Sequence, residues 1–269
     1  LIGTDAFQET DILGMTLGIV KHSYLVTDAD ELPAIMDQAI QLAQSGRPGP
    51  VWIDIPKDIL LNPVSREALT LEPTIKDSPK TGNAWQHQIE QAKSLLANAK
   101  KPLLYTGGGI ALAGAEELLR AFLTTTQLPC VETLKGLGNS GRHYPYNLGM
   151  LGMHGSKAAN LAVEECDLLI ATGARFDDRA TGQVATFAPN ADIIQIECDP
   201  AEIAKLKDCD IALQGDLADI LPALGMTLSI SEWQQDCTNS RKTNGFCLPA
   251  NNHKNNDDAA QEHCINGPA

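Results

Sequence analysis

The sequence predicts an α/β protein with a doubly wound parallel sheet, preceded by the end of another α/β unit. Short apolar strands alternate with amphipathic helices between about residues 83 and 225, which is typical of a parallel sheet with helices on both faces. Glycine or polar residues follow each of these strands. A proline-containing segment without periodicity, from about 58 to 82, separates this region from a helix and a strand nearer the N-terminus.

Composition and charge narrow the class of protein. The 269 residues carry a net charge of −14, which argues against a nucleic acid or an anionic membrane surface as partner. Every apolar stretch is shorter than the roughly 20 residues of a membrane-spanning helix, and no secretory signal opens the sequence. We therefore expect a cytoplasmic protein, or a plastid or mitochondrial one if a transit peptide has been lost.

The seven cysteines include no CxxC pair, so we expect neither disulfides nor a metal site.

The first expected elements are a helix and a strand near the N-terminus. Apolar residues recur at helical spacing from Leu32 to Ala43, with Asp30 as a candidate N-cap and Gly46 at the end. The segment PVWIDIP, residues 50–56, then predicts a short strand.

The region after the linker contains the alternating elements. We expect helices at 84–99, at 107–126 after a glycine turn, and at 156–166, 200–207 and 217–225. We expect strands at 101–106, 128–133, 167–172, 191–199 and 210–216. The ligand site of such a sheet lies outside the carboxyl ends of its strands.

Two stretches fall outside this alternation. Residues 136–156 are rich in glycine and predict a long loop, which is usually functional or disordered. Met150 and Met153 within it either fill a core or form an adaptable wall against a flat ring. From about residue 236 the chain is rich in asparagine and poor in periodic apolar residues, so we expect disorder there.

The strand ends carry groups that suit a ligand. The glycine triplet at 107–109 allows a close backbone approach and offers N–H groups at the start of a helix. A carboxylate after a later strand commonly accepts hydrogen bonds from ribose hydroxyls in dinucleotide folds. Candidate groups after the other strands are Thr133, Leu134, Lys135, Glu197 and Asp216.

The densest group of charges is GARFDDR, residues 173–179, which follows the third strand of this region. One interpretation is that Arg175 and Arg179 form surface ion pairs with Asp177 and Asp178, which contribute little stability. The other is that the guanidinium groups bind diphosphate oxygens bidentately while the carboxylates orient them or accept from ligand hydroxyls. The position at a strand's carboxyl end favours the second. The residues alone therefore predict a domain for an adenine dinucleotide or another phosphate ligand.

Several long segments resemble one enzyme family, the catalytic large subunit of acetolactate synthase, a thiamine-diphosphate enzyme that also binds FAD. The segments that carry the resemblance are GTDAFQETD, KHSYLV, SGRPGPVWIDIPKDI, YTGGG, TLKGLG, YPYNLGMLGMHGSKAAN, CDLLIATGARFDDR, TFAP and LQGD. The resemblance extends to about residue 235. It implies that residues 1–60 end a thiamine-pyrimidine-binding domain, 61–82 form a linker, 83–225 form the central FAD-binding domain, and 226–269 are a remnant with a disordered tail.

The resemblance also implies site residues, residue by residue. The implied FAD contacts are Arg47, Gly107, Gly108, Gly109, Thr133, Leu134, Lys135, Leu151, Gly152, Met153, His154, Gly173, Ala174, Arg175, Asp177, Arg179, Glu197 and Asp216. The implied lining of the channel to the thiamine ring is Phe7, Gln8, Lys57, Met153, Asp178 and Arg179. Of these, Lys57 or Arg179 would attract the carboxylates of keto acids.

The family reaction decarboxylates one pyruvate and adds the product to a second 2-keto acid, pyruvate or 2-ketobutyrate, in branched-chain amino-acid biosynthesis. In the family, FAD takes no net redox part, and subunits form homo-oligomers with a regulatory small subunit. Thiamine diphosphate and Mg²⁺ belong to the complete enzyme. The activating glutamate would precede residue 1, and no GDG metal motif occurs in this sequence, which opens with Leu1. We therefore expect a fragment that is inactive alone.

Two alternatives stay open at this point. One is a non-catalytic module that binds an adenine dinucleotide. The other is a related thiamine enzyme such as glyoxylate carboligase or pyruvate oxidase, against which KHSYLV and RFDDR weigh.

Overall fold

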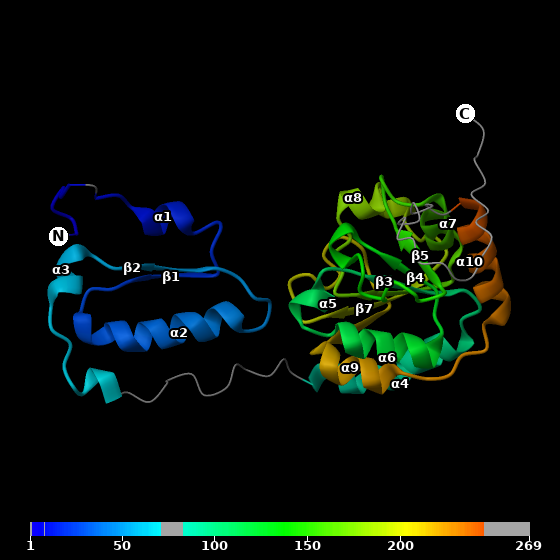
Figure 1. The fold of residues 1–269 in the computed structure, drawn as a ribbon, viewed down its shortest axis with the longest axis horizontal. Coiled ribbons are helices and arrows are strands. Elements are labelled where there is room, and N and C mark those ends of the chain that lie inside the picture. Colours follow the sequence, from blue (N-terminus) through cyan, green and yellow to red (C-terminus); the bar gives the residue numbers. More distant parts are fainter. Residues whose placement is uncertain (1, 8, 71–82, 245–269) are drawn as a thin grey trace, which may run out of the picture. The chain divides into compact units, whose positions relative to one another are not determined.

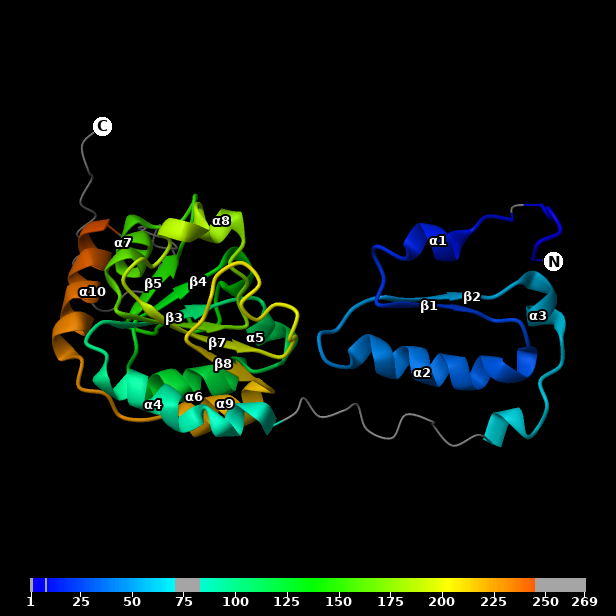
Figure 2. The ribbon, with the colours of Figure 1, turned by 180° about the vertical axis from the view of Figure 1, so that it is seen from behind.

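The computed structural model describes residues 2–7, 9–70 and 83–244. The chain divides into two compact units, Leu1–Gly82 and Asn83–Ala269. Each unit contains its own parallel sheet, as the two opposite views in Figure 1 and Figure 2 show.

The first unit is built on a two-stranded parallel sheet. β1 (His22–Leu25) pairs with β2 (Val51–Asp54), and α2 (Leu32–Gln44) connects them. The remaining elements are α1 (Ile12–Thr16), α3 (Lys57–Leu61) and 3-10 turns at Ala29–Glu31 and Ala68–Thr70. The predicted helix and strand are thus present as α2 and β2, whereas β1 was not among the predicted strands.

The predicted linker begins too early at residue 61. The N–H of Ser65 donates to Asp30 Oδ1 over 2.6 Å, and Ala68 is buried. Residues 61–70 therefore pack within the first unit. The rest of the predicted linker, 71–82, lies outside the described residues.

Six parallel strands form the sheet of the second unit, in the order β5-β4-β3-β6-β7-β8. Their bounds are β3 (Pro102–Thr106), β4 (Cys130–Glu132), β5 (Asn147–Met150), β6 (Leu168–Thr172), β7 (Asp192–Glu197) and β8 (Ile211–Gln214). β3 and β6 lie side by side, and the chain proceeds from them toward opposite edges of the sheet. This junction is the topological switch point of a doubly wound sheet, and the predicted fold class is confirmed.

Helices cover both faces of this sheet (Figure 1). One face carries α4 (Ile89–Asn98), which follows a 3-10 turn at Asn83–His87, together with α6 (Glu116–Thr126) and α9 (Leu217–Leu224). The other face carries α7 (Lys157–Glu165) and α10 (Ser231–Asn244). β3 and β6 are buried along their whole length because helices cover both sides. Within the described ranges, no helix combines the length and the apolar character needed to cross a membrane.

Two predicted helices differ from those observed. The helix expected at 107–126 is divided into α5 (Gly109–Leu112) and α6 by Gly114, which has a φ of +61°. Residues 200–207 form turns rather than a helix. The buried Gln195 side chain donates to the carbonyl of Glu202 and accepts from the N–H of Ala204, both over 2.9 Å. These bonds satisfy backbone groups that a helix would otherwise pair.

The loop predicted at 136–156 contains β5. Gly149, with a φ of +90°, lies inside this edge strand, and the pairing with β4 shifts register between Cys130 and Glu132. An irregular strand with an internal glycine lacks the pattern from which strands are predicted.

The disorder predicted from residue 236 is wrong for residues 236–244, which belong to α10. The buried residues of this helix are Trp233 and Cys237, one turn apart. Two apolar positions on a polar helix are too few for its periodicity to be recognised. Residues 245–269 lie outside the described part of the chain.

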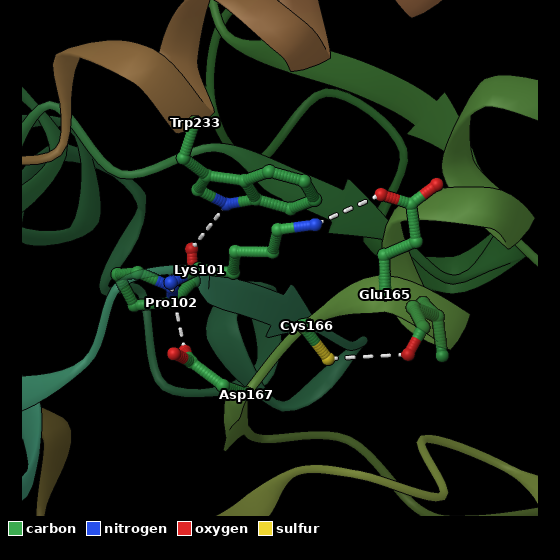
Figure 3. A network of polar contacts seen from close by, with 7 residues as sticks. Lys101, Pro102, Glu165, Cys166, Asp167 and Trp233 are labelled. Carbon is green, nitrogen blue, oxygen red and sulfur yellow. Dashed lines mark hydrogen bonds and ion pairs between the residues drawn. The ribbon is translucent and has the colours of Figure 1, made fainter.

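Trp233 attaches α10 to the start of β3, as Figure 3 shows. Its indole Nε1 donates to the carbonyl of Pro102 over 3.0 Å. Lys101 Nζ lies 5.2 Å from the centroid of the indole ring and 3.1 Å from a carboxylate oxygen of Glu165. The end of the described chain is therefore packed against residues more than 100 positions earlier.

We expect Trp233→Ala to lower the free energy of unfolding of the second unit by about 3 kcal/mol, because it leaves a cavity and removes the bond to Pro102. The measurement is the urea dependence of hydrogen exchange in β3 and β6, which reports on this unit alone. Trp52→Ala is the matched control, since Trp52 lies in the first unit and is 41% exposed. Equal exchange in both variants would show that α10 adds no stability to the sheet.

Candidate functional site

The turns after β3 and β6 pack directly on each other at the switch point. The N–H of Gly107 donates to the carbonyl of Thr172 (3.1 Å) and that of Gly109 to the carbonyl of Gly173 (2.9 Å). A Cβ on Gly107 would lie 2.2 Å from the Gly173 oxygen, and one on Gly109 would lie 2.7 Å from the Gly173 Cα. The protein's own packing therefore requires glycine at both positions.

The middle glycine of the triplet faces the turn after β4. A Cβ on Gly108 would lie 2.9 Å from Lys135 Cβ, so Lys135 packs over this turn. Thr133 caps the 3-10 turn Leu134–Gly136 by accepting from the N–H of Gly136. Leu134 and Lys135 are exposed, and Leu134 therefore presents an apolar side chain to solvent beside the glycine turn.

The segment from Leu151 to His154 joins β5 to the edge where β6 ends. The N–H of Met153 donates to the carbonyl of Arg179 over 3.2 Å. Gly152 has a φ of +92°, and a Cβ there would lie 2.3 Å from the same Arg179 oxygen. Met153 and His154 are exposed, whereas Leu151 is buried. The structure thus brings the LGMHG segment against α8 (Asp178–Thr181), which carries part of GARFDDR.

GARFDDR combines a buried apolar part with exposed charges. Ala174 and Phe176 are buried. Arg175, Asp178 and Arg179 are exposed. Within the described ranges, no side chain forms an ion pair with either arginine. The interpretation of these charges as mutual surface ion pairs is therefore wrong.

Aromatic packing fixes the backbone that carries these charges. Tyr105 on β3 donates its hydroxyl to the carbonyl of Arg175 over 2.9 Å. Its ring lies 5.9 Å from that of Phe176 and 6.0 Å from that of Phe187, measured between centroids. Burial, with the nearby Asp177 charge, raises the pKa of Tyr105, so its hydroxyl stays a proton donor at neutral pH. Arg175 is held at its backbone while its guanidinium group extends outward.

The predicted carboxylates of Glu197, the last residue of β7, and of Asp216, after β8, already make contacts within the protein. Glu197 Oε1 accepts from the N–H of Cys198 (2.9 Å) and of Asp199 (3.3 Å). Asp216 Oδ1 caps α9 by accepting from the N–H of Ala218 over 2.8 Å. Both therefore order their strand ends whether or not a ligand is present.

The remaining predicted residues belong to the first unit. Phe7, Arg47 and Lys57 are exposed there, and Gln8 lies outside the described residues. The channel that the resemblance implies, formed by Phe7, Gln8 and Lys57 with Met153, Asp178 and Arg179, stays a prediction.

Two buried polar residues at this edge, Glu132 and Thr172, were not among the predicted site residues. Glu132 is 2% exposed and accepts from the N–H groups of Gly138 and Ser140. Thr172 Oγ1, at the end of β6, is buried with no hydrogen-bond partner among the described residues. Polar residues at the last position of apolar strands are the sequence feature by which both were recognisable. No group of three or more His, Cys, Asp or Glu side chains in the described part of the chain could hold a metal ion.

The sequence is similar to known proteins over most of its length. Residues 89–224, about half of the chain, match the family described as "Thiamine pyrophosphate enzyme, central domain". The chain is 54% identical over 240 residues to acetolactate synthase isozyme 2 large subunit of Escherichia coli, covering 89% of this chain and 43% of that protein. It is 45% identical over 244 residues to acetolactate synthase large subunit of Corynebacterium glutamicum (87% of this chain, 38% of that protein). With acetolactate synthase 1, chloroplastic, of Zea mays, it is 45% identical over 231 residues (85% and 36%).

The chain therefore belongs to the thiamine pyrophosphate enzyme family and contains its central domain. Within that family, its similarity to the large subunits of acetolactate synthase confirms the resemblance seen in the sequence. The chain spans about two fifths of the length of these relatives.

We expect Gly107→Ala to destabilise the second unit by at least about 2 kcal/mol, because the new methyl group collides with backbone atoms after β6. Gly18→Ala is the control, since a Cβ there meets nothing within 4 Å. Urea-dependent hydrogen exchange of β3 and β6 gives the difference. Unchanged protection in Gly107→Ala would contradict the packing of the two turns.

The contact of Glu197 with Cys198 is testable through the thiol. Burial, followed by the Glu197 charge, raises the pKa of Cys198 to about 11. Glu197→Gln removes that charge, so we expect a lower thiol pKa and severalfold faster alkylation by iodoacetamide at pH 8.5, measured by peptide mass spectrometry. Cys166 is the internal control, because burial is the main cause that raises its pKa to about 12. An unchanged rate at Cys198 would rule out the electrostatic contact.

Proposed function

We propose that the chain is part of the catalytic large subunit of an acetolactate synthase and that its second unit binds FAD at the carboxyl edge of the sheet. The observation that carries this proposal is the pair Arg175 and Arg179. Both extend from the end of β6, at the switch point, without an ion pair to any described side chain. Guanidinium groups so placed suit the diphosphate of a dinucleotide.

The surrounding residues fit the chemistry of a dinucleotide. The N–H of Gly108 donates to no carbonyl within the described ranges and is available to a phosphate oxygen. Glu197 ends β7 and Asp216 comes shortly after β8, at strand ends where ribose hydroxyls bind in folds of this kind. Leu134 and Met153, 71% and 66% exposed, offer apolar surface to a flat ring. The buried Thr172 hydroxyl has no hydrogen-bond partner among the described residues and would be available to a ligand atom at the end of β6.

FAD binding would use residues of this unit to hold and orient the ligand. Arg175 and Arg179 would neutralise the diphosphate, and Asp177 would orient the guanidinium groups or accept from ligand hydroxyls. The exposed Met153 would pack on the ring and, through its bond to the Arg179 carbonyl, couple the ring's position to α8. The flavin would take no net redox part in the reaction.

In the complete enzyme, thiamine diphosphate with Mg²⁺ would supply the electron sink for decarboxylation of pyruvate. Lys57 and Arg179 would attract the carboxylates of pyruvate and of the second keto acid, pyruvate or 2-ketobutyrate. The products would be 2-acetohydroxy acids for branched-chain amino-acid synthesis. Homo-oligomers and a regulatory small subunit are the proposed protein partners. Acetolactate formation from pyruvate by a longer protein that contains this chain tests the activity.

We expect the double variant Arg175→Ala, Arg179→Ala to bind FAD at least about tenfold more weakly than the wild-type chain, because two charge-assisted contacts to the diphosphate are lost. Flavin fluorescence titration gives the dissociation constant, and the absorbance retained after desalting gives an independent measure. Arg142→Ala, which removes an exposed arginine from the loop before β5, should bind FAD normally. Equal retention by the double variant would place the cofactor elsewhere, and no FAD binding by folded wild-type chain would contradict the proposed cofactor site.

A further inference from the structure

Asn139 links two turns that lie at the proposed FAD site. This residue follows β4 in the chain and is 4% exposed. Its amide nitrogen Nδ2 donates to the carbonyl of Gly107 over 2.9 Å and to Thr106 Oγ1 over 3.4 Å. The Gly107 carbonyl is only an acceptor, so the amide nitrogen of Asn139 must face it. Asn139 therefore holds the glycine turn after β3 from a loop 32 residues later.

The loop that carries Asn139 is fixed from two sides. The buried carboxylate of Glu132 accepts from the N–H of Gly138 (3.1 Å) and from the N–H and hydroxyl of Ser140 (2.9 and 2.8 Å). On the other side, Arg120 Nε donates to the Asn139 carbonyl (3.2 Å) and Nη2 to the Gly138 carbonyl (3.3 Å). These bonds hold the backbone on both sides of Asn139. The Cα from which the Asn139 side chain extends is therefore fixed in place.

The direction of the Gly107 carbonyl determines the direction of one N–H group. The C=O of Gly107 and the N–H of Gly108 belong to the same planar trans peptide and point to opposite sides of it. Asn139 binds the C=O, so the Gly108 N–H is directed away from Asn139. Among the described residues this N–H has no acceptor. The Gly107 carbonyl also accepts from the N–H of Ile110, but over 3.4 Å, so the contact with Asn139 is the shorter of its two hydrogen bonds. Glycine populates many backbone conformations, and loss of the shorter bond leaves this peptide less restricted.

We propose that Asn139 is a positioning residue for the dinucleotide site. It orients the peptide between Gly107 and Gly108 so that the Gly108 N–H is presented to an anionic oxygen of the ligand. This inference rests on the proposed FAD site. Asn139 itself touches no ligand; it acts through the peptide, which distinguishes it from the residues proposed to contact FAD.

Three variants of the full 269-residue chain test the role of Asn139. Asn139→Ala removes the shorter of the two hydrogen bonds to the Gly107 carbonyl and leaves the one from Ile110. Asn139→Asp replaces the donor with a carboxylate that faces the Gly107 oxygen at neutral pH and regains an O–H donor when protonated. Asn98→Ala is the matched control, because Asn98 is an exposed asparagine that bonds the Ser94 carbonyl within α4.

The first measurement is hydrogen exchange without ligand. We expect peptides that cover residues 107–113 to exchange faster in Asn139→Ala than in wild type or Asn98→Ala, while circular dichroism shows all three folded. Unchanged exchange there would overturn the inference, whatever the result with FAD.

The second measurement is FAD binding between pH 7.5 and pH 5.0, expressed as the ratio of the variant to the wild-type dissociation constant. We expect about fivefold weaker binding for Asn139→Ala at every pH, the effect of one hydrogen bond. For Asn139→Asp the ratio should fall toward one as the pH falls, because burial beside a carbonyl raises the pKa of the new carboxyl above the usual value of about 3.9 and protonation restores a donor. A merely structural defect would give no such recovery.

The two proposals fail in different ways. If wild-type chain binds FAD and Asn139→Ala binds it equally well, the inference about Asn139 is wrong and the FAD site stands. If folded wild-type chain binds no FAD, the proposed cofactor site is wrong, and the hydrogen-exchange comparison alone decides whether Asn139 holds the glycine turn.

Discussion

The contact between the turns after β3 and β6 is the constraint on which the rest of the second unit depends. Two adjacent parallel strands end at the same edge, and their chains leave toward opposite edges of the sheet. The turns can lie this close only without side chains, because a Cβ on Gly107 would fall 2.2 Å from the Gly173 oxygen. Glycine at this junction thus serves the protein's own packing first. Any space left for a ligand is a consequence of the same absence of side chains.

Around this junction, several polar residues hold the backbone of the residues that are proposed to bind the ligand, without contacting the ligand themselves. Asn139 and Tyr105 each bond a backbone carbonyl of a turn, at Gly107 and Arg175. Glu132 in turn fixes the loop that carries Asn139. Satisfied buried polar groups of this kind restrict a loop to one conformation. The exposed arginines therefore extend from a backbone already fixed in place, and ordering it adds no cost when a ligand binds.

The parts of this fold that the sequence predicts are those with a regular apolar pattern. β3 and β6 are continuous apolar runs, so both strands could be recognised in the sequence. Once the ends of these strands were known, the glycines after β3 and the arginines after β6 could be placed at the edge of the sheet. β5 could not be recognised, because Gly149 and a register shift interrupt its pattern. The turns at 200–207 depend on Gln195, a residue in another element, whose side chain replaces helical hydrogen bonds. α10 is attached to the sheet through Trp233, which gives the helix too weak an apolar pattern to be predicted. The contact of Asn139 with Gly107 joins two loops, and no local sequence pattern indicates it.

The order of the strands also has a consequence for how the chain folds during synthesis. β3, at the centre of the sheet, is the first of the six strands to be made, yet its partner β6 comes about 60 residues later and the tryptophan that covers its start comes later still. Translation at about 5–20 residues per second leaves this apolar strand with one open edge for several seconds. An unpaired apolar edge is prone to bind other chains. The strand order that forms the switch point thus leaves the nascent chain open to aggregation until β6 has been made and can pair with β3.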